Sequence, residues 1–553
     1  MPRRTTCSLL LDSTFRRWTL WRWRHNWPLG ESDTERRLPP YISLSPQNES
    51  CAILPEKPLG APKGRLSLSL AGDRVEIERP ADLFDKAHNS TALHGFAWAH
   101  DLAPEWIGAL WGEWNQHFGE PKTDHPAWGA LITVSRALNL LRLAHTIGLP
   151  GTAKALCLHA KHIISHLEYR GEGTTGSLLA LQGHALLRLG LEMQMTQTTE
   201  DGLKILINEA KRLIRPSGIS AEGSTLAHLR LTQAYADSWL AAKRANLPEA
   251  AFLEHAAGRL LSVISALTLP GEMPLIGDAD GCEAALDFTV LHRHAPLEGA
   301  WISGLDSESR QAFQVLRDSS FQPDLEALRA DGWLRLDQGP WAGLWHVSPN
   351  GWPELQNLAH HDQGSFVLHY EGVPVFVDPG RGPVDSVDAY ASASLHNGVD
   401  LNGQGATPCN HAIYSDVFRR EIVTRAPDLR TQSDGVSLDS DGYNRLGGPR
   451  EASRRWTFDG DSLILSDHIK GTGRFRITRR LITPFSATVE TDGTVTLQGH
   501  GSLRFRIEGG SPVSVSDAWR SLPNGSLMPV RVIEFAHGKT TLPYRAQITV
   551  TRL

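Results

Sequence analysis

The hydrophobic and polar residues of the chain follow two different periods, and the change between them divides the sequence into two large parts. Between about Leu83 and Thr268, apolar residues recur every three or four positions, which predicts amphipathic helices. Short connections between them favour antiparallel neighbours. A helical array of this length stacks as a solenoid or closes into a toroid, and the sequence has no fixed-period repeat, which weakens the solenoid. We expect about seven helices, at 106–118, 131–147, 153–169, 177–193, 201–214, 225–245 and 250–267.

Near Gly332 the period changes from that of a helix to that of a strand. Stretches such as WLRLD (333–337) and RFRITRRLITPF (474–485) alternate apolar and polar residues, and Glu371-Gly372 and Asp459-Gly460 predict tight turns. About ten strands without intervening helices indicate a large antiparallel β-sandwich. The predicted parts are a partly irregular N-terminal segment with one or two strands (1–80), a helical domain (81–305), a linker with one short helix (306–331) and the sandwich (332–553).

Composition and charge exclude some classes of protein. Hydrophobic residues make up 41% of the chain and charged residues 21%, which is ordinary for a globular protein. Lys and Arg number 55 against 61 Asp and Glu, so the net charge of -6 does not favour a nucleic-acid partner. No run of about 18 apolar residues is present, so we expect no membrane-spanning helix.

The N-terminal segment and the cysteines give weaker information. Asp12 and several arginines interrupt the apolar residues of the first 30 positions, so a conventional signal peptide is not expected, which favours the cytoplasm. Phe15, Trp18 and Trp21 share one helical face, which either docks on the protein or makes a peripheral contact with an anionic membrane. The five cysteines are odd in number and far apart, and they indicate neither a disulfide framework nor a cysteine zinc site.

The densest cluster of polar residues lies at the end of a predicted hairpin. His360, Asp378 and His396 follow one another at intervals of eighteen positions. The turn at Glu371-Gly372 folds the two ends of the hairpin together, so His360 and Asp378 are expected side by side. Imidazole and carboxylate ligands suit zinc. The cluster is therefore a candidate zinc site, and the alternative is a set of polar loop residues at the rim of a sheet.

These residues resemble a known family. The motifs HxDxGSF (360–366), VDPG (377–380) and HN (396–397) are similar to the heparinase II/III-like C-terminal domain of polysaccharide lyases. Motifs in the helical part occur in a similar order in such proteins, at 93–102, 128–139, 166–170 and 276–281.

The resemblance implies a fold, an activity and a cofactor. The fold would be an α+β multidomain protein with an N-terminal incomplete α/α toroid followed by a large antiparallel β-sandwich. The activity would be β-elimination on uronic-acid-containing polysaccharide, with zinc bound by His360, Asp378 and His396. The family resemblance also favours a periplasmic location over the cytoplasmic one.

Elimination of this kind needs three groups, and here the sequence departs from the family. One group neutralises the uronate carboxylate, a base removes the C5 proton, and an acid protonates the departing O4. Family members often have His, Asn-His and Tyr where this chain has Leu358, Ser177-Leu178 and Ala227. Either other groups perform the elimination, or the lyase activity is lost.

Replacement candidates can be named in both domains. His361 adjoins a predicted zinc ligand, Tyr390 precedes His396, and His228 lies in the helical domain, and these three are the catalytic candidates. For His228 and Tyr390 an ordinary packing role is the alternative. Arg136 and Asn139 are three positions apart and share a helix face that can hold a carboxylate. The full set of substrate-binding candidates, expected to line a cleft toward the sandwich or its rim, is Arg136, Asn139, Glu222 and Arg381.

Three functions are compatible with these patterns. The first is a polysaccharide lyase whose partner is an acidic polysaccharide or oligosaccharide. The second is a catalytically impaired carbohydrate-binding protein with the same fold. The third is a glycoside hydrolase, which would need two carboxylates ~5–10 Å apart across the cleft. Glu222 with Asp278 or Asp280 would be the candidates for that pair.

Overall fold

The computed structural model describes most of the chain after residue 35. The predictions for the N-terminal aromatic face, for Asp278 and Asp280 and for Leu358 lie outside the described residues. Those that the structure describes are 36–43, 49, 51–70, 73–87, 91–122, 125–171, 175–277, 288–319, 322–351, 355, 360–383, 386–407, 425–499, 501–510, 512–522 and 526–553.

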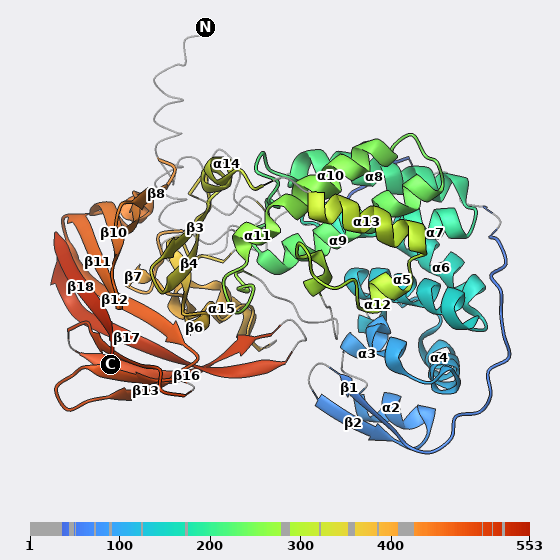
Figure 1. The fold of residues 1–553 in the computed structure, drawn as a ribbon, viewed down its shortest axis with the longest axis horizontal. Coiled ribbons are helices and arrows are strands. Elements are labelled where there is room, and N and C mark those ends of the chain that lie inside the picture. Colours follow the sequence, from blue (N-terminus) through green and yellow to red (C-terminus); the bar gives the residue numbers. More distant parts are fainter. Residues whose placement is uncertain are drawn as a thin grey trace, which may run out of the picture.

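Helices form one end of the molecule (Figure 1). Three of them, α5, α7 and α9, contact one another as an inner row, and α6, α8 and α10 pack outside them. The inner helices are buried around most of their circumference, as an apolar helix in a core must be. This is an incomplete α/α toroid. Its helices are α2 (Pro80–Ala87), α3 (Thr91–Gly95), α4 (Pro104–Phe118), α5 (Ala130–Ile147), α6 (Thr152–Ser165), α7 (Leu178–Glu192), α8 (Thr196–Leu213), α9 (Thr225–Arg244), α10 (Ala250–Ser262), α11 (Ile264–Leu267), α12 (Ala300–Ser303), α13 (Ser307–Ser319) and α14 (Leu325–Ala330).

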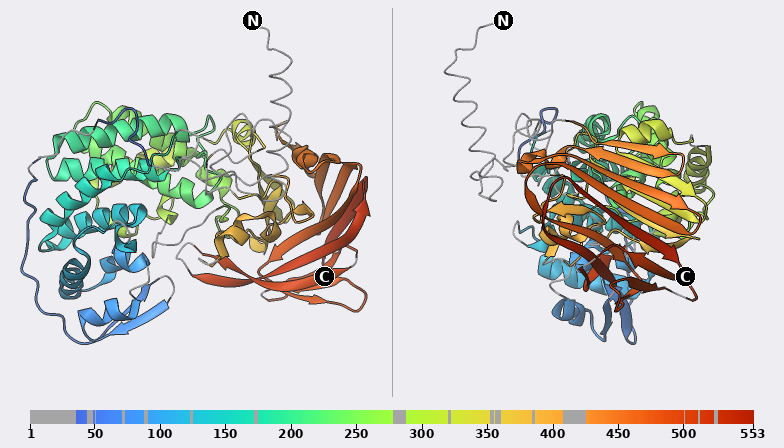
Figure 2. Two further views of the ribbon diagram at one scale, coloured as in Figure 1. Left: turned by 180° about the vertical axis from the view of Figure 1, so that it is seen from behind. Right: turned by 90° about the vertical axis from the view of Figure 1, so that its left-hand side faces the viewer.

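Antiparallel sheets form the other end (Figures 1 and 2). An eight-stranded sheet in the order β13-β14-β15-β18-β11-β10-β9-β8 packs against two four-stranded sheets, β16-β17-β12-β7 and β3-β4-β5-β6. Trp345, Trp456 and Phe535 belong to one core between these sheets. The strands are β3 (Trp333–Gln338), β4 (Trp341–His346), β5 (Ser365–Tyr370), β6 (Val373–Phe376), β7 (Val399–Leu401), β8 (Asp428–Gln432), β9 (Gly435–Ser440), β10 (Pro449–Asp459), β11 (Ser462–Gly471), β12 (Arg474–Thr483), β13 (Ser486–Val489), β14 (Val495–Gln498), β15 (Arg504–Glu508), β16 (Val513–Ser521), β17 (Leu527–Thr541) and β18 (Tyr544–Arg552), and the short helix α15 (Val387–Ala391) precedes β7.

The predicted fold class, a helical toroid followed by an antiparallel sandwich, is confirmed. The one or two strands predicted in the N-terminal segment are also present, as the hairpin β1 (Leu66–Leu70) and β2 (Asp73–Ile77). One detail differs. The predicted linker 306–331 contains two helices rather than one. Buried Phe313 places α13 in the same apolar core as α9 and α10, so this segment is part of the helical domain.

The two domains meet through an apolar core and several hydrogen bonds. Leu267 and Leu269 of the helical domain pack with Trp333 and Leu344 of the sandwich. His369 Nδ1 lies 2.7 Å from the carbonyl oxygen of Pro270. At the next residue, Gly271, a side chain would overlap the backbone of the β5–β6 turn, so only glycine allows this approach.

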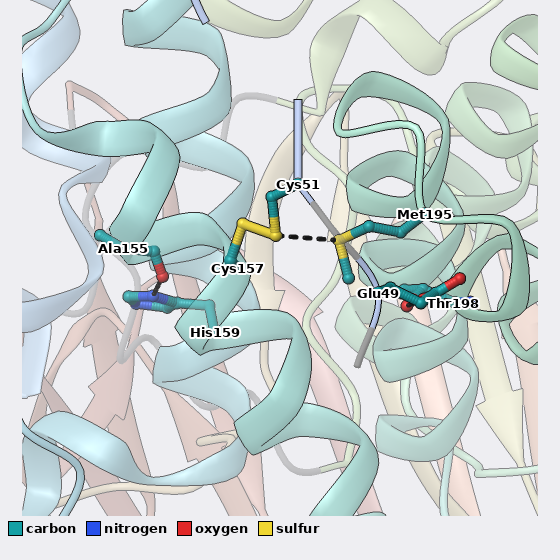
Figure 3. The surroundings of a disulfide bond; sticks show 7 residues. All are labelled: Glu49, Cys51, Ala155, Cys157, His159, Met195 and Thr198. Carbon is teal, nitrogen blue, oxygen red and sulfur yellow. Dashed lines mark hydrogen bonds between the residues drawn. A yellow bond between two sulfur atoms is a disulfide. The ribbon is translucent and has the colours of Figure 1, made fainter. Parts of the chain in front are cut away.

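A segment before β1 runs along the outer side of the helices (Figure 1), and a disulfide attaches it. Cys51 bonds to Cys157 of α6, beside the sulfur of Met195 (Figure 3). Glu49 accepts a hydrogen bond of 2.6 Å from the backbone N–H of Gln197 at the start of α8, where a carboxylate favours the helix dipole. The spacing of the cysteines indicated no disulfide framework, and it gave no signal for this single bond.

One helical stretch, Ala250–Leu267, is long and apolar enough to cross a membrane by length and composition. It includes α10 and α11, and 56% of its residues are buried inside the molecule. A core helix meets the same criterion, and the packing of these helices against α9 accounts for its hydrophobicity.

The disulfide is expected to contribute measurably to stability. Replacing Cys157 by Ser opens a loop that spans 106 positions, which should lower the free energy of unfolding by about 3–5 kcal/mol. Urea denaturation of the variant and of the wild type, with and without reductant, measures the difference. The double variant Cys51→Ser/Cys157→Ser should lose no more than the single one, and a further loss would contradict the assigned bond.

Candidate functional site

The three predicted metal ligands meet at the edge of the sheet that contains β5 and β6. The ligand atoms of His360, Asp378 and His396 lie within 4.8 Å of one another, and all three residues are buried. The rings of His360 and His396 have centroids 5.0 Å apart. His396 Nδ1 lies 3.0 Å from Asp378 Oδ2. Among the described residues, no other group of His, Cys, Asp and Glu side chains is as compact.

Hairpin geometry explains why residues so distant in sequence converge here. His360 precedes β5 and Asp378 follows β6, and these two strands pair through the turn at Glu371-Gly372. Asp378 is fixed further by the backbone N–H of Gly380, which donates to its Oδ1 at 2.8 Å. The predicted convergence of His360 with Asp378 is therefore present in the structure.

Charges within the triad are strongly coupled. Burial, together with the neighbouring His396, lowers the pKa of His360 to about 3, so this imidazole is neutral at pH 7. Burial alone would lower the pKa of His396, but the charge and hydrogen bond of Asp378 outweigh it and raise this pKa to about 9. Burial likewise opposes ionisation of Asp378, yet His396 keeps the pKa of this carboxyl below its usual value.

The donor set fits a zinc ion. His360 Nδ1 is buried and has no hydrogen-bond partner, so a lone pair of a neutral imidazole is available there. His396 Nε2 lies 2.8 Å from the carbonyl oxygen of Tyr390, which orients the ring so that Nδ1 faces Asp378. A backbone acceptor on the far nitrogen is the usual support of a metal-binding histidine. Two imidazoles and one carboxylate leave a fourth position of tetrahedral zinc open.

Two residues close to the triad were not proposed as site residues from the sequence. Asp362 is buried with Oδ2 unpartnered, and burial raises its pKa to about 7. His346 of β4 is also buried, with Nδ1 3.9 Å from Asp362 Oδ1. The sequence holds a signal for Asp362, which lies in the same HxD motif as His360. It holds none for His346, since a single histidine in a buried strand resembles many packing residues.

The sandwich candidates for catalysis lie beside the triad. His361 is half-buried, and its backbone N–H donates to the carbonyl oxygen of Ala391 at 2.8 Å, next to Tyr390. Tyr390 is only 5% exposed, and its hydroxyl accepts from the backbone N–H of Trp519 at 2.9 Å. Arg381 is half-buried. Gly382, with φ +67°, lies directly on the Tyr390 ring, where a side chain would overlap it.

The helical candidates His228 and Glu222 are buried within the toroid. His228 is 0% exposed, accepts from the backbone N–H of Ser220 at 3.3 Å and bonds the carbonyl oxygen of Leu260 at 3.1 Å, so both ring nitrogens are used. Burial lowers its pKa to about 4. Glu222 accepts from the backbone N–H of Ser177 at 2.6 Å and so holds the start of α7. Ala227, at the usual tyrosine position, is itself buried.

Arg136 and Asn139 lie on α5 but do not share an environment. Arg136 is 0% exposed and donates to the carbonyl oxygens of His94 (3.1 Å) and Ala127 (2.5 Å) and to His159 Nε2 (2.8 Å). Its guanidinium lies over Trp128, with the Trp114 ring also in contact. These contacts leave it no surface for a carboxylate, so the face predicted to carry both residues into a cleft is not present. Asn139 instead lines a cavity among the inner helices.

The fold and the triad together define the class of protein, a two-domain architecture shared with polysaccharide lyases. Solved structures with this fold include heparinase III (15% identity, 83% of this chain and 75% of that chain, TM-score 0.57). A heparan sulfate lyase mutant from Pedobacter heparinus also has this fold, with 15% identity over 81% of this chain and 72% of that chain and a TM-score of 0.50. A heparinase III gene product has 13% identity over 86% of this chain and 80% of that chain, with a TM-score of 0.51.

The family is identified by sequence. Residues 322–550 match the family model described as heparinase II/III-like, C-terminal, so the sandwich is a heparinase II/III-like C-terminal domain. The resemblance noted in the sequence is thus confirmed. No curated protein matches the chain.

The role of Arg136 can be tested by a conservative change. In Arg136→Lys an ammonium cannot reach three acceptors in different directions, so the free energy of unfolding should fall by about 2–3 kcal/mol. Urea denaturation measures the loss, with the half-exposed Arg244→Lys as the matched control. Unchanged stability combined with weaker saccharide binding would instead restore the substrate role that the sequence suggested.

Proposed function

We propose that the protein is a zinc-dependent polysaccharide lyase that cleaves uronic-acid-containing polysaccharide by β-elimination. The observation that carries the proposal is the buried triad His360, Asp378 and His396, held on a sandwich of the heparinase II/III-like family. The shared fold of heparinase III and heparan sulfate lyase supports the class of reaction and of substrate. The site residues are proposals that rest on this geometry.

The chemistry assigns His361 and Tyr390 to proton transfer. Imidazole is the side chain most often used for proton transfer near neutral pH, and His361 is a histidine next to the triad that is not one of its proposed ligands. Its position next to a metal ligand fixes its backbone, which reduces the cost of orienting the ring. Tyr390 supplies a hydroxyl, and its backbone carbonyl oxygen lies 2.8 Å from His396 Nε2. Bound zinc would strengthen the local positive potential that acidifies the substrate and a nearby phenol.

One observation favours the alternative, a carbohydrate-binding protein with impaired catalysis. The positions where related lyases have Asn and Tyr hold Ser177 and Ala227, and both residues are buried. The toroid then offers no phenol at that point of its surface. The elimination would have to depend on the sandwich side alone.

The disulfide bears on the compartment. A bond between Cys51 and Cys157 persists in an oxidising environment such as the periplasm or the extracellular space. This supports the location that the family resemblance favours over the cytoplasmic one.

Zinc binding gives the first test of the proposal. Purified protein should contain about one equivalent of zinc, and Asp378→Asn and His396→Gln should lose it. Because the pKa of His396 is raised to about 9, zinc must displace its proton at pH 7, so metal-free protein should release about one proton per zinc. Affinity should therefore rise as pH increases toward 9.

Elemental analysis measures the zinc content, and calorimetry in buffers of different ionisation enthalpy measures the number of protons released per zinc. His117→Gln, a change at an exposed histidine far from the triad in sequence, is the matched control. A wild-type protein that binds no zinc between pH 7 and 9 would exclude the metal.

Elimination itself is tested with a panel of uronic-acid polymers, followed through the absorbance of the unsaturated product. His361→Ala should reduce the rate by about 10²–10⁴ while zinc content and stability remain those of the wild type. The His117→Gln control should keep full activity. A wild-type protein that binds the panel without forming unsaturated product would support the binding alternative, and new reducing ends without the absorbance would indicate hydrolysis.

A further inference from the structure

A cavity of about 310 Å³ lies inside the toroid, away from the metal triad. The inner helices α5, α7 and α9 line it along much of their length, and residues 298–301 with 304 and 305 close one side. Its volume falls in the range of small-molecule sites, which begins near 300 Å³. The buried walls carry several arginines, so the cavity is not an apolar packing defect.

Most charges that line the cavity are paired. Asp237 accepts hydrogen bonds from Arg188 Nη1 at 2.7 Å, from His184 Nε2 at 2.8 Å and from the indole of Trp301 at 3.0 Å. Arg244 lies 2.9 Å from Glu192. These carboxylates are therefore already neutralised by cations or by hydrogen bonds. They form the fixed wall of the cavity.

Arg142 differs from these paired residues. No carboxylate of the described residues lies within ion-pair distance of its guanidinium. Its Nη1 lies 3.3 Å from Asn139 Oδ1 and 3.1 Å from His100 Nε2. Asn139 Nδ2 donates to the carbonyl oxygen of Gly95, which fixes the amide so that its oxygen faces these two side chains.

The other nitrogens of Arg142 are held in position by the packing of its side chain and not by hydrogen bonds. Its Nε and Nη2 form no hydrogen bond with any residue that the structure describes. Gly304 lies against the stem, where an added Cβ would come within 3.2 Å of Arg142 Cγ. Burial lowers the pKa of Arg142 to about 10, partly offset by Asp237, so the guanidinium stays charged at neutral pH. The side chain of Arg142 is half-buried, so a carboxylate or sulfate in the cavity would pair with a cation that water hydrates only in part.

We propose that this cavity binds an acidic sugar unit, with its carboxylate or sulfate on Arg142. A guanidinium binds either anion through two parallel hydrogen bonds. Neutral polar side chains of Ser135, Gln233 and Thr146 can bond hydroxyl groups, and apolar walls suit the C–H faces of a pyranose ring. These walls are Leu131, Val134, Leu138, Leu181, Ala234 and Val290.

The choice of sugar rests on the proposed function, whereas the preference for an anion rests on the half-buried guanidinium of Arg142 alone. Arg142 lies twelve residues into α5, about 18 Å along the helix from its first residue. The triad lies on the sandwich, so this is a second site. It would hold a short acidic saccharide or product away from the reacting bond.

Calorimetric titration of the full-length protein tests the site with three probes, glucuronate, glucosamine 6-sulfate and glucose. Both acidic sugars should bind about tenfold or more tightly than glucose, and Arg142→Gln should remove that preference. Whichever of the two acidic sugars binds more tightly shows whether the site prefers a carboxylate or a sulfate. Equal binding of acidic and neutral sugars, binding of neither acidic sugar, or wild-type affinity in Arg142→Gln would overturn the proposal.

Two further variants separate the outcomes. Leu138→Trp narrows the cavity without changing charge and should weaken both acidic probes, which keeps the test valid if Arg142→Gln does not fold. His361→Ala, which the proposed function expects to lack elimination, should keep wild-type affinity for the acidic monosaccharides. Loss of binding in His361→Ala would place the sugar at the triad and contradict the cavity site, whatever the outcome for the lyase reaction.

Discussion

The candidate metal triad depends on one buried amide, that of Asn397. Its Nδ2 donates to the carbonyl oxygens of Phe366 in β5 (2.7 Å) and Val377 after β6 (3.0 Å), and its Oδ1 accepts from the backbone N–H of Ile482 in β12 (2.6 Å). The residue is 0% exposed, so these bonds form without competition from water. Since Asp378 follows Val377 and His396 precedes Asn397, the amide sets the separation of the two ligands.

The satisfaction of buried polar atoms separates structural from functional residues in this fold. His228 is as buried as His360, yet hydrogen bonds to fixed neighbours occupy both of its ring nitrogens. Arg136 is equally buried: its Nε and Nη1 donate to fixed neighbours, whereas its Nη2 has no hydrogen-bond partner and the guanidinium packs on two indole rings. His360 Nδ1 and Asp362 Oδ2 are buried without partners in a small space. Native proteins rarely leave such atoms unsatisfied. A bound ion would remove the penalty at the triad, whereas both ring nitrogens of His228 already have partners.

The sequence predicted what depends on local pattern. The change of period near Gly332 separates toroid from sandwich, and the turn at Glu371-Gly372 brings His360 to Asp378. Long-range geometry was out of reach: Cys51 and Cys157 are 106 positions apart, and no local signal links them. Which side of α5 faces the outer helices and which faces the lumen depends on the neighbouring helices, and the sequence of α5 alone does not show it. For this reason Arg136 was predicted to bind substrate, whereas in the structure it packs on Trp128.

The loop that follows Asp378 and the interface between the two domains share one strand, β16. In β16, Arg520 donates to Glu272 of the helical domain at 2.6 Å, while the next residue, Ser521, donates its backbone N–H to Pro379 at 3.0 Å. Ser521 Oγ also accepts from the backbone N–H of Gly382 beside Tyr390. The loop that follows Asp378 is thus bonded to the strand that holds the toroid. The same strand therefore fixes the position of the toroid relative to the loop that carries Asp378 and to Tyr390, one of the residues proposed for proton transfer.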